Sequence, residues 1–308
     1  MKILITCPPM LRRIADFEHI FKDKNIEIYT PTVVQTLSEA ELLTLVPDFD
    51  GWIIGDDPCT EKVLQAGVKG KLRAAVKWGV GVDNVDFLAA KKLNLPIANT
   101  PMMFGSEVAD IALNYVIGLA RQTFWIDRKI REGEWLKPSG MSLKGKKVAL
   151  VGFGDIGLHT AKRLDICGMS LQVYDPYARE KISHYEFLQF PNKIEQADFI
   201  VLTCALTTET KHLINANLLE KVKKGVRIVN VSRGALIDEK ALLVALQNGT
   251  VHSAALDVFE EEPLPLTSPL HNFEYCIFGS HNASNTVDAV RKASVKAIEL
   301  LFGFLKVN

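Results

Sequence analysis

The sequence predicts an α/β protein built on parallel β-sheets, and three observations lead to this prediction. Short apolar runs typical of strands alternate with helical patterns along the whole chain. Many of these runs are almost continuously apolar, which indicates parallel strands covered by helices on both faces. The chain has 308 residues, enough for about two domains of roughly 150 residues each.

Strands are predicted where short β-branched runs are bounded by Gly, Pro or Asp. The predicted strands cover residues 2–6, 26–30, 51–55, 73–77, 147–154, 171–175, 199–203, 226–232 and 253–259. Between them, Ser38 and Glu41 form the capping-box pattern that opens a helix. A long helical pattern from about Phe104 to Glu132 separates two sets of strands, so we expect the chain to divide there.

Composition narrows the class of function. The chain has 36 Lys and Arg against 36 Asp and Glu, so its formal net charge is zero and neither nucleic acid nor a membrane surface is an expected partner. The five cysteines lack a CxxC pair and the seven histidines lack an HExxH motif, so no metal site is expected. The N-terminal apolar run is too short for a signal peptide. We therefore expect a cytoplasmic protein that acts on a small molecule.

One glycine-rich motif carries a specific prediction. Gly152, Gly154 and Gly157 form a GxGxxG directly after a predicted strand and before a helix, the pattern that binds a dinucleotide pyrophosphate. Asp175 ends the next strand, where its carboxylate would bind the adenosine ribose and repel a 2′-phosphate, which favours NAD over NADP. Arg179 lies close enough to leave NADP open. The alternative is a glycine turn required only for packing, followed by a solvated aspartate.

Three further predicted strands are followed by charged residues. Arg233 follows the predicted strand 226–232, Asp257 with the glutamate run 260–262 lies at the end of the predicted strand 253–259, and His281 follows the apolar run 275–278; such strand ends form the ligand-binding edge of a parallel sheet. Arginine binds carboxylates in a bidentate manner, and a carboxylate beside a histidine raises the histidine pKa and orients the ring. This set suits the reduction of a 2-keto acid. Each residue also has a purely structural alternative, and His271 is a rival histidine.

The ordered motifs GFGDIG, YDPY, NVSRGALID, ALDVFEEEP and GSHNAS resemble those of the D-isomer-specific 2-hydroxyacid dehydrogenases. In appearance the chain is most similar to the short phosphoglycerate dehydrogenases, so with 308 residues we expect it to lack the C-terminal regulatory domain of the longer ones. The resemblance implies an NAD-dependent oxidoreductase that interconverts a D-2-hydroxy acid and its 2-keto acid. It also implies a Rossmann NAD domain, residues 100–284, inserted into a discontinuous flavodoxin-like substrate domain made of residues 1–99 and 285–308.

The resemblance assigns roles to particular residues. Arg233 is expected to bind and polarise the keto acid. His281 is expected to donate the proton in reduction and accept it in oxidation, paired with Glu262. The backbone at Val80 and Gly81 is expected to bind the substrate carboxylate. The expected cofactor contacts are Val80, Gly152, Gly154, Asp155, Ile156, Gly157, Asp175, Cys204, Ser232, Arg233, Asp257 and His281.

Several departures from the family pattern leave the substrate open. Ser280 replaces the usual proline before the catalytic histidine, and Cys204-Ala205 replaces a Thr-Pro pair. Glu262 stands where members that act on formate carry glutamine, which argues against formate. The candidate substrates are 3-phosphoglycerate, glycerate or hydroxypyruvate, glyoxylate and D-lactate. Arg12, Arg13 and Lys77 lie in or next to loops of the substrate domain and are the cations that could bind a substrate phosphate; the alternative is that they are solvated surface residues.

Two expectations concern partners. In the resembled family the region of Trp135 forms a twofold interface, so a homodimer is expected, with a tryptophan folded onto its own domain as the alternative. The competing function is an NAD-sensing protein similar to the corepressors that share this fold.

Overall fold

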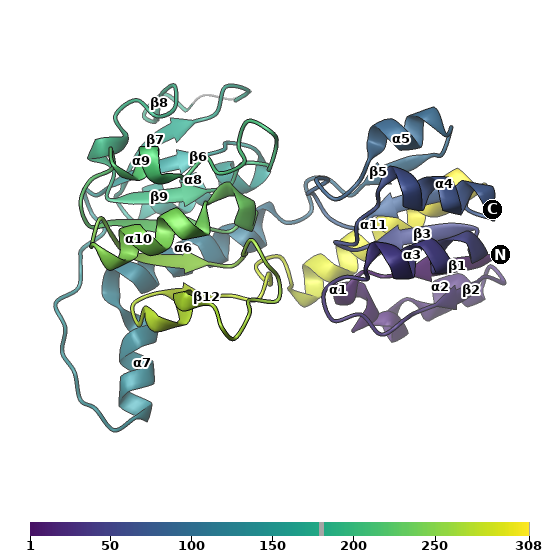
Figure 1. The fold of residues 1–308 in the computed structure, drawn as a ribbon, viewed down its shortest axis with the longest axis horizontal. Coiled ribbons are helices and arrows are strands. Elements are labelled where there is room, and N and C mark those ends of the chain that lie inside the picture. Colours follow the sequence, from purple (N-terminus) through teal and green to yellow (C-terminus); the bar gives the residue numbers. More distant parts are fainter. Residues whose placement is uncertain (179–181, 308) are drawn as a thin grey trace. The chain divides into compact units, whose positions relative to one another are not determined.

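The computed structural model describes residues 1–178 and 182–307, which form two compact units (Figure 1). Unit 1 comprises Met1–Met103 and the C-terminal segment from Asn285, and unit 2 comprises Phe104–Ser284. The boundaries expected from the sequence lie at 99/100 and 284/285. Each unit is built on its own parallel sheet, so the predicted fold of two α/β domains is confirmed.

Unit 1 contains a five-stranded sheet in the order β2-β1-β3-β4-β5, which is the flavodoxin-like order. Its strands are β1 (Lys2–Ile5), β2 (Glu27–Tyr29), β3 (Gly51–Ile54), β4 (Ala74–Lys77) and β5 (Ile97–Asn99). Every pairing between neighbours is parallel, so all five strands present their carboxyl ends at one edge. That edge carries the loop from Trp78 to Asn84 that follows β4.

The helices of unit 1 are α1 (Pro8–Leu11), α2 (Glu18–Lys22), α3 (Glu39–Leu45), α4 (Glu61–Lys69), α5 (Phe87–Lys92) and α11 (Val287–Leu305), with the 3₁₀ turns η1 (Ile14–Asp16) and η2 (Val46–Asp48). The predicted capping box opens α3, since Ser38 and Glu41 each accept a backbone hydrogen bond from the other. The C-terminal helix α11 packs on β3 and β4, which explains why unit 1 is discontinuous in sequence.

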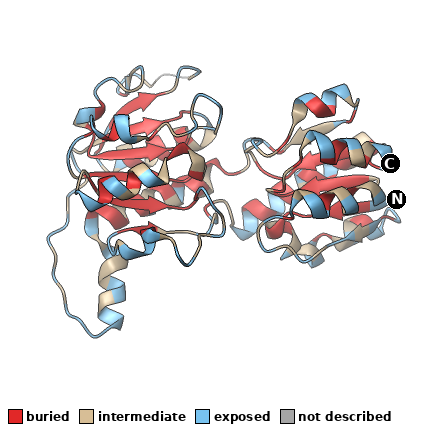
Figure 2. Ribbon diagram, in the orientation of Figure 1, coloured by how far each residue is buried: buried red, intermediate tan, exposed pale blue. Residues whose placement is uncertain are grey.

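Unit 2 contains a seven-stranded parallel sheet in the order β12-β11-β10-β9-β6-β7-β8. Its strands are β6 (Lys147–Val151), β7 (Ser170–Tyr174), β8 (Glu186–Phe187), β9 (Phe199–Leu202), β10 (Val226–Asn230), β11 (Val251–Leu256) and β12 (Ile277–Phe278). The order reverses between β6 and β9, as in a Rossmann sheet, and dinucleotides bind at that switch point. Figure 2 shows that the central strands of both sheets are buried, among them β3 and β4 in unit 1 and β9 and β10 in unit 2.

The helices of unit 2 are α6 (Gly105–Arg121), α7 (Thr123–Arg131), α8 (Asp155–Ile166), α9 (Ala216–Leu219) and α10 (Glu239–Gln247), with the turns η3 (Ile194–Gln196), η4 (Gly234–Leu236) and η5 (Pro269–Asn272). The single helical pattern expected from Phe104 to Glu132 is interrupted at Gln122, whose φ is +57°. Helix α6 is largely buried against α8, whereas α7 has no buried residue. Across the residues that the structure describes, no helix combines the length and apolarity needed to cross a membrane.

Candidate active site

The three glycines of the turn between β6 and α8 do not all serve the same purpose. Gly152 has a φ of +96°, and a Cβ there would lie 2.5 Å from the backbone nitrogen of Cys204. A Cβ on Gly157 would lie 2.2 Å from the carbonyl oxygen of Gly152. A Cβ on Gly154 would meet no atom within 4 Å. Gly152 and Gly157 are therefore required by packing, whereas Gly154 leaves open space at the N-terminus of α8, which fits a pyrophosphate.

Asp175, directly after β7, is bound to this turn. Its Oδ2 accepts a hydrogen bond of 2.6 Å from the backbone N–H of Phe153, and its Oδ1 accepts one of 2.7 Å from Tyr177. The carboxylate is therefore held where a ribose bound at the turn would lie. Arg179, the residue that left NADP open, lies outside the described residues.

Asp155 and Ile156 are the first two residues of α8. The Asp155 side chain packs against Gly105, the first residue of α6, because a Cβ on that glycine would lie 2.4 Å from Asp155 Oδ1. The start of α8 is thus fixed both by the glycine turn and by the neighbouring helix α6.

A buried asparagine organises the loop that carries Arg233. Asn230, the last residue of β10, accepts a 3.1 Å hydrogen bond from Ser232 N and donates one of 2.8 Å to the carbonyl of Arg233. The Ser232 hydroxyl donates to the carbonyl of Cys204 at the end of β9. Burial raises the pKa of the Cys204 thiol to about 11, so this thiol stays protonated at neutral pH. Asn230 is the first residue of the motif NVSRGALID, but the sequence predicted no role for it.

Asp257 anchors the loop that carries His281. This buried residue follows β11, and its carboxylate accepts hydrogen bonds from Ala283 N at 2.9 Å, Asn282 N at 3.3 Å and the Tyr115 hydroxyl at 3.3 Å. Its carbonyl accepts one of 2.7 Å from His281 N. Burial and the neighbouring Asp257 raise the pKa of Tyr115, so the phenol remains a donor. The sequence predicted Asp257 only as a cofactor contact, and holding the His281 loop is a further role for this residue.

His281 and Glu262 form a hydrogen-bonded pair. His281 Nδ1 donates to Glu262 Oε2 over 2.7 Å, and Glu262 Oε1 accepts from Phe259 N over 2.9 Å. Glu260 instead binds His212, with 2.6 Å between Oε1 and Nε2. The rival His271 is exposed in η5, and its Nε2 lies 3.1 Å from the carbonyl of Pro265. Because Nδ1 is bound to a carboxylate, proton exchange at His281 falls to Nε2.

The order of strands explains how unit 2 brings these residues together. Strands β10, β11 and β12 are parallel neighbours, so the loops that follow them share one edge of the sheet. Arg233, Asp257 and His281 stand in those three loops. A guanidinium and a histidine–carboxylate pair at one edge can bind an anion and exchange a proton.

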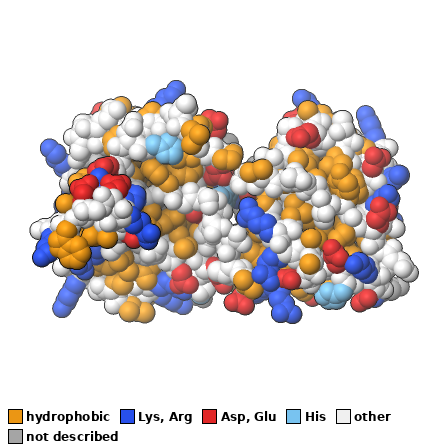
Figure 3. Space-filling view, turned by 90° about the horizontal axis from the view of Figure 1, so that it is seen from below, with side chains coloured by type: hydrophobic (Ala, Val, Ile, Leu, Met, Phe, Trp, Pro, Cys, Tyr) orange, Lys and Arg blue, Asp and Glu red, His pale blue; other side chains and the backbone are white. Residues whose placement is uncertain are grey.

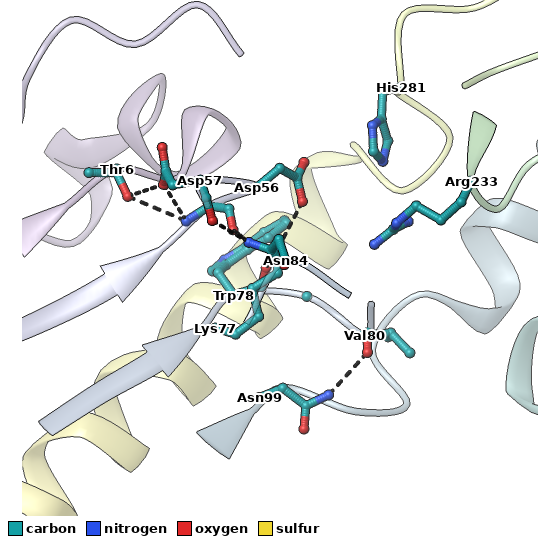
Figure 4. A network of polar contacts seen from close by, with 12 residues as sticks. Thr6, Asp56, Asp57, Lys77, Trp78, Val80, Asn84, Asn99, Arg233 and His281 are labelled. Carbon is teal, nitrogen blue, oxygen red and sulfur yellow. Dashed lines mark hydrogen bonds and ion pairs between the residues drawn. The ribbon is translucent and has the colours of Figure 1, made fainter. Parts of the chain in front are cut away.

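In unit 1, the loop expected to bind the substrate carboxylate is held from both sides. Gly79 N donates to the Thr100 hydroxyl over 2.8 Å. As Figure 4 shows, Asn99 Nδ2 donates to the carbonyl of Val80, over 3.1 Å. Val80 and Gly81 themselves are partly exposed.

One expectation about this edge needs correction. Lys77 is not a loop cation, because it ends β4, is 2% exposed and binds Asp56 through a 2.9 Å ion pair. Arg13 binds Asp16 over 2.8 Å, and Arg12 is exposed at the end of α1. Within residues 1–178 and 182–307, no cluster of three or more His, Cys, Asp or Glu residues is arranged to hold a metal ion.

Comparison with known proteins decides the family. Residues 113–283 match the family described as "D-isomer specific 2-hydroxyacid dehydrogenase, NAD binding domain". The chain belongs to the D-isomer-specific 2-hydroxyacid dehydrogenase family. This dehydrogenase is accordingly an NAD-dependent oxidoreductase that interconverts a D-2-hydroxy acid and its 2-keto acid, as its motifs predicted.

Several relatives extend the similarity to both units. The dehydrogenase is 33% identical over 271 residues to a hydroxypyruvate reductase of Thermotoga maritima, covering 86% of this chain and 88% of that one. It is 33% identical over 306 residues to a D-3-phosphoglycerate dehydrogenase of Methanocaldococcus jannaschii, covering 97% of this chain but 56% of that protein. The crystal structure of a glyoxylate reductase from Paecilomyes thermophila has a TM-score of 0.84, 26% identity and coverage of 99% and 96%.

Proposed function

We propose that this dehydrogenase uses NADH to reduce a small 2-keto acid that has no second charged group, either hydroxypyruvate or glyoxylate. The observation that carries the proposal is the 2.7 Å contact between His281 and Glu262. The choice of substrate is supported by the hydroxypyruvate reductase relative, which is covered over 88% of its length, whereas the phosphoglycerate dehydrogenase is covered over 56%.

The proposed roles follow from the chemistry of each side chain. Arg233 binds the substrate carboxylate and polarises the keto group, since its planar fork matches a carboxylate. Glu262 orients the His281 ring and favours its protonated form, so that Nε2 gives a proton to the keto oxygen. When bound, NADH supplies the hydride to the carbonyl carbon, which yields the hydroxy acid. In the oxidative direction, His281 takes the hydroxyl proton back.

The proposed cofactor contacts use the two features that fit a dinucleotide. The open position at Gly154 and the N–H groups of Asp155 and Ile156 would hold the pyrophosphate, and Asp175 would hold the ribose. The remaining proposed contacts, taken over from the family resemblance, are Val80, Cys204, Ser232, Arg233, Asp257 and His281. Val80 and Gly81 are proposed to donate backbone N–H groups to the substrate carboxylate.

We further propose a cytoplasmic homodimer. Helix α7 and the segment that follows it extend from unit 2 (Figure 1), and Trp135 in that segment is 79% exposed. An exposed tryptophan of this kind is a typical anchor of an interface. On the face drawn in Figure 3, acidic and basic side chains are interspersed, in keeping with a net charge of zero and with no nucleic-acid partner.

A panel of 2-keto acids tests the proposal. The unmutated protein is incubated with NADH and hydroxypyruvate, glyoxylate or pyruvate, and the loss of NADH absorbance is followed. We expect the highest kcat/KM with hydroxypyruvate or glyoxylate. NADH binding without turnover of any acid would favour the corepressor-like alternative, which the named relatives do not support.

A further inference from the structure

We propose that Asp56 is a specificity-determining residue that excludes substrates with a second anionic group, such as a phosphate. The proposal concerns the loop after β4 in unit 1, and it rests on the proposed function of Val80 and Gly81 as the carboxylate-binding backbone. The proposal depends on which member of the Lys77–Asp56 ion pair is exposed beside that loop.

The cation beside the loop is already neutralised. Lys77 Nζ lies 2.9 Å from Asp56 Oδ1 and donates a 3.2 Å hydrogen bond to the carbonyl of Trp78 (Figure 4). One ammonium group therefore joins the carboxylate to the loop. The Lys77 side chain is 3% exposed and that of Asp56 is 36% exposed, so the outward-facing member of the pair is the carboxylate.

The turn that carries Asp56 is rigid. Its neighbour Asp57 is fully buried and accepts hydrogen bonds from the Thr6 hydroxyl, from Leu37 N at 2.8 Å and from Gly55 N at 3.1 Å. Because these donors fix the turn after β3, the Asp56 carboxylate is held in its ion pair with Lys77.

The loop is tied to the same turn. Asn84 Nδ2 donates to the carbonyl of Asp57 over 2.7 Å and to that of Gly55 over 3.1 Å. At the other end of the loop, Trp78 Nε1 donates to the hydroxyl of Ser294 over 3.0 Å. Loop and turn thus form one unit, and Lys77 cannot turn outward without breaking contacts to both.

A keto acid bound by its carboxylate at this loop would present its tail near Asp56. A phosphate tail would meet the Asp56 carboxylate, whereas phosphate-binding proteins place a cation at such a position. Bringing two like charges together lowers the affinity for the substrate. An uncharged hydroxymethyl tail meets no such repulsion. Arg12 is the exposed cation on this edge that competes with the proposal.

The experiment compares hydroxypyruvate with 3-phosphohydroxypyruvate, which differ by one phosphate. In the unmutated protein we expect kcat/KM to be about 100-fold or more higher for hydroxypyruvate, as repulsion of this kind predicts. In D56N, which frees the Lys77 charge, we expect the ratio of kcat/KM for the phosphorylated acid to kcat/KM for hydroxypyruvate to rise about tenfold or more.

Asp50→Asn is the matched control. Asp50 immediately precedes β3, as Asp56 follows it, and it pairs with Arg73 over 3.3 Å at the opposite edge of the sheet. This substitution also removes one carboxylate charge next to β3, but at the other end of the strand. The ratio of the two kcat/KM values should therefore not change. A second variant, K77M, leaves the carboxylate but removes the cation, and the phosphorylated acid should remain a poor substrate.

Two results would overturn the inference. One is equal or better use of 3-phosphohydroxypyruvate by the unmutated protein, and its loss in R12A would then identify Arg12 as the phosphate ligand. The other is an unchanged ratio in folded D56N. Absence of turnover with both acids would overturn the proposed function as well, so the two failures are distinguishable.

Discussion

His281 is held through its backbone, its neighbours and its ring. Its N–H donates to the carbonyl of Asp257, the next two residues donate to the Asp257 carboxylate, and Nδ1 donates to Glu262. The residue has a φ of +53°, a left-handed conformation that is uncommon outside glycine and that this hydrogen bonding maintains. A ring positioned in this way presents Nε2 in a fixed direction, which proton transfer requires.

The charge on Glu262 should set the pH range of reduction. Reduction needs protonated His281, and the adjacent carboxylate stabilises that form, so the activity is present at low pH and is lost as pH rises. In Glu262→Gln the charge is removed, and the midpoint of this loss in kcat/KM should move to lower pH. The measurement is the pH dependence of hydroxypyruvate reduction.

The control for this prediction is Glu260→Gln, because Glu260 is paired with a different histidine, His212, over 2.6 Å. Its pH profile should match that of the unmutated protein. A profile that shifts in Glu260→Gln but not in Glu262→Gln would show that the wrong glutamate was chosen.

For individual residues, the sequence predicts the charged side chains of the candidate site but not the residues that position those side chains. Arg233, Glu262 and His281 are recognisable because charged groups follow apolar strands. The roles of Asn230 and Tyr115 were not predicted, although Asn230 begins the motif NVSRGALID, because both act through hydrogen bonds. The bond from Tyr115 to Asp257 spans 142 residues of sequence, and no local pattern records it.

At the scale of elements, strand periodicity predicts most of the site's framework. The strands expected near residues 226–232 and 253–259 correspond to β10 and β11, and their parallel pairing sets the shared edge. The strands β5 and β8 were not predicted, because neither lies in a longer β-branched run, whereas β2, which also has three residues, lies in the run 26–30. The interruption at Gln122 was also missed, since nothing in a glutamine signals a left-handed conformation.

The turn between β6 and α8, with Asp175 bound to it, should determine the choice of cofactor. Asp175 would accept hydrogen bonds from the ribose hydroxyls, each worth about 1.5–3 kcal/mol, and repel a 2′-phosphate. The Kd for NADH should therefore be at least about tenfold lower than that for NADPH. In Asp175→Ser the gap should narrow, chiefly through weaker binding of NADH.

Fluorescence titration with both nucleotides measures these constants. Asp165→Asn is the control, because Asp165 lies on α8 but binds His184 over 2.9 Å. Its nucleotide preference should be unchanged. Equal affinities for NADH and NADPH in the unmutated protein would contradict the role given to Asp175.

At the scale of the whole molecule, the exposed segment after α7 predicts self-association. Replacing Trp135, which is 79% exposed, by alanine should weaken a homodimer at least about tenfold, since interface tryptophans commonly contribute 2 kcal/mol or more. Light scattering across a dilution series gives the dissociation constant. Leu266→Ala is the control, because Leu266 is 95% exposed outside this segment. A monomer at micromolar concentration in the unmutated protein would remove the prediction.

His281 is proposed to transfer the proton in an NAD-dependent reduction. The most direct test is His281→Asn, with hydroxypyruvate reduction and the Kd for NADH measured on the same preparation. We expect kcat to fall by about 10²–10⁴-fold while the Kd for NADH changes little, because general acid catalysis contributes an effect of that size. Near-normal turnover in the variant would contradict the claim, as would a loss of NADH binding equal to the loss of turnover.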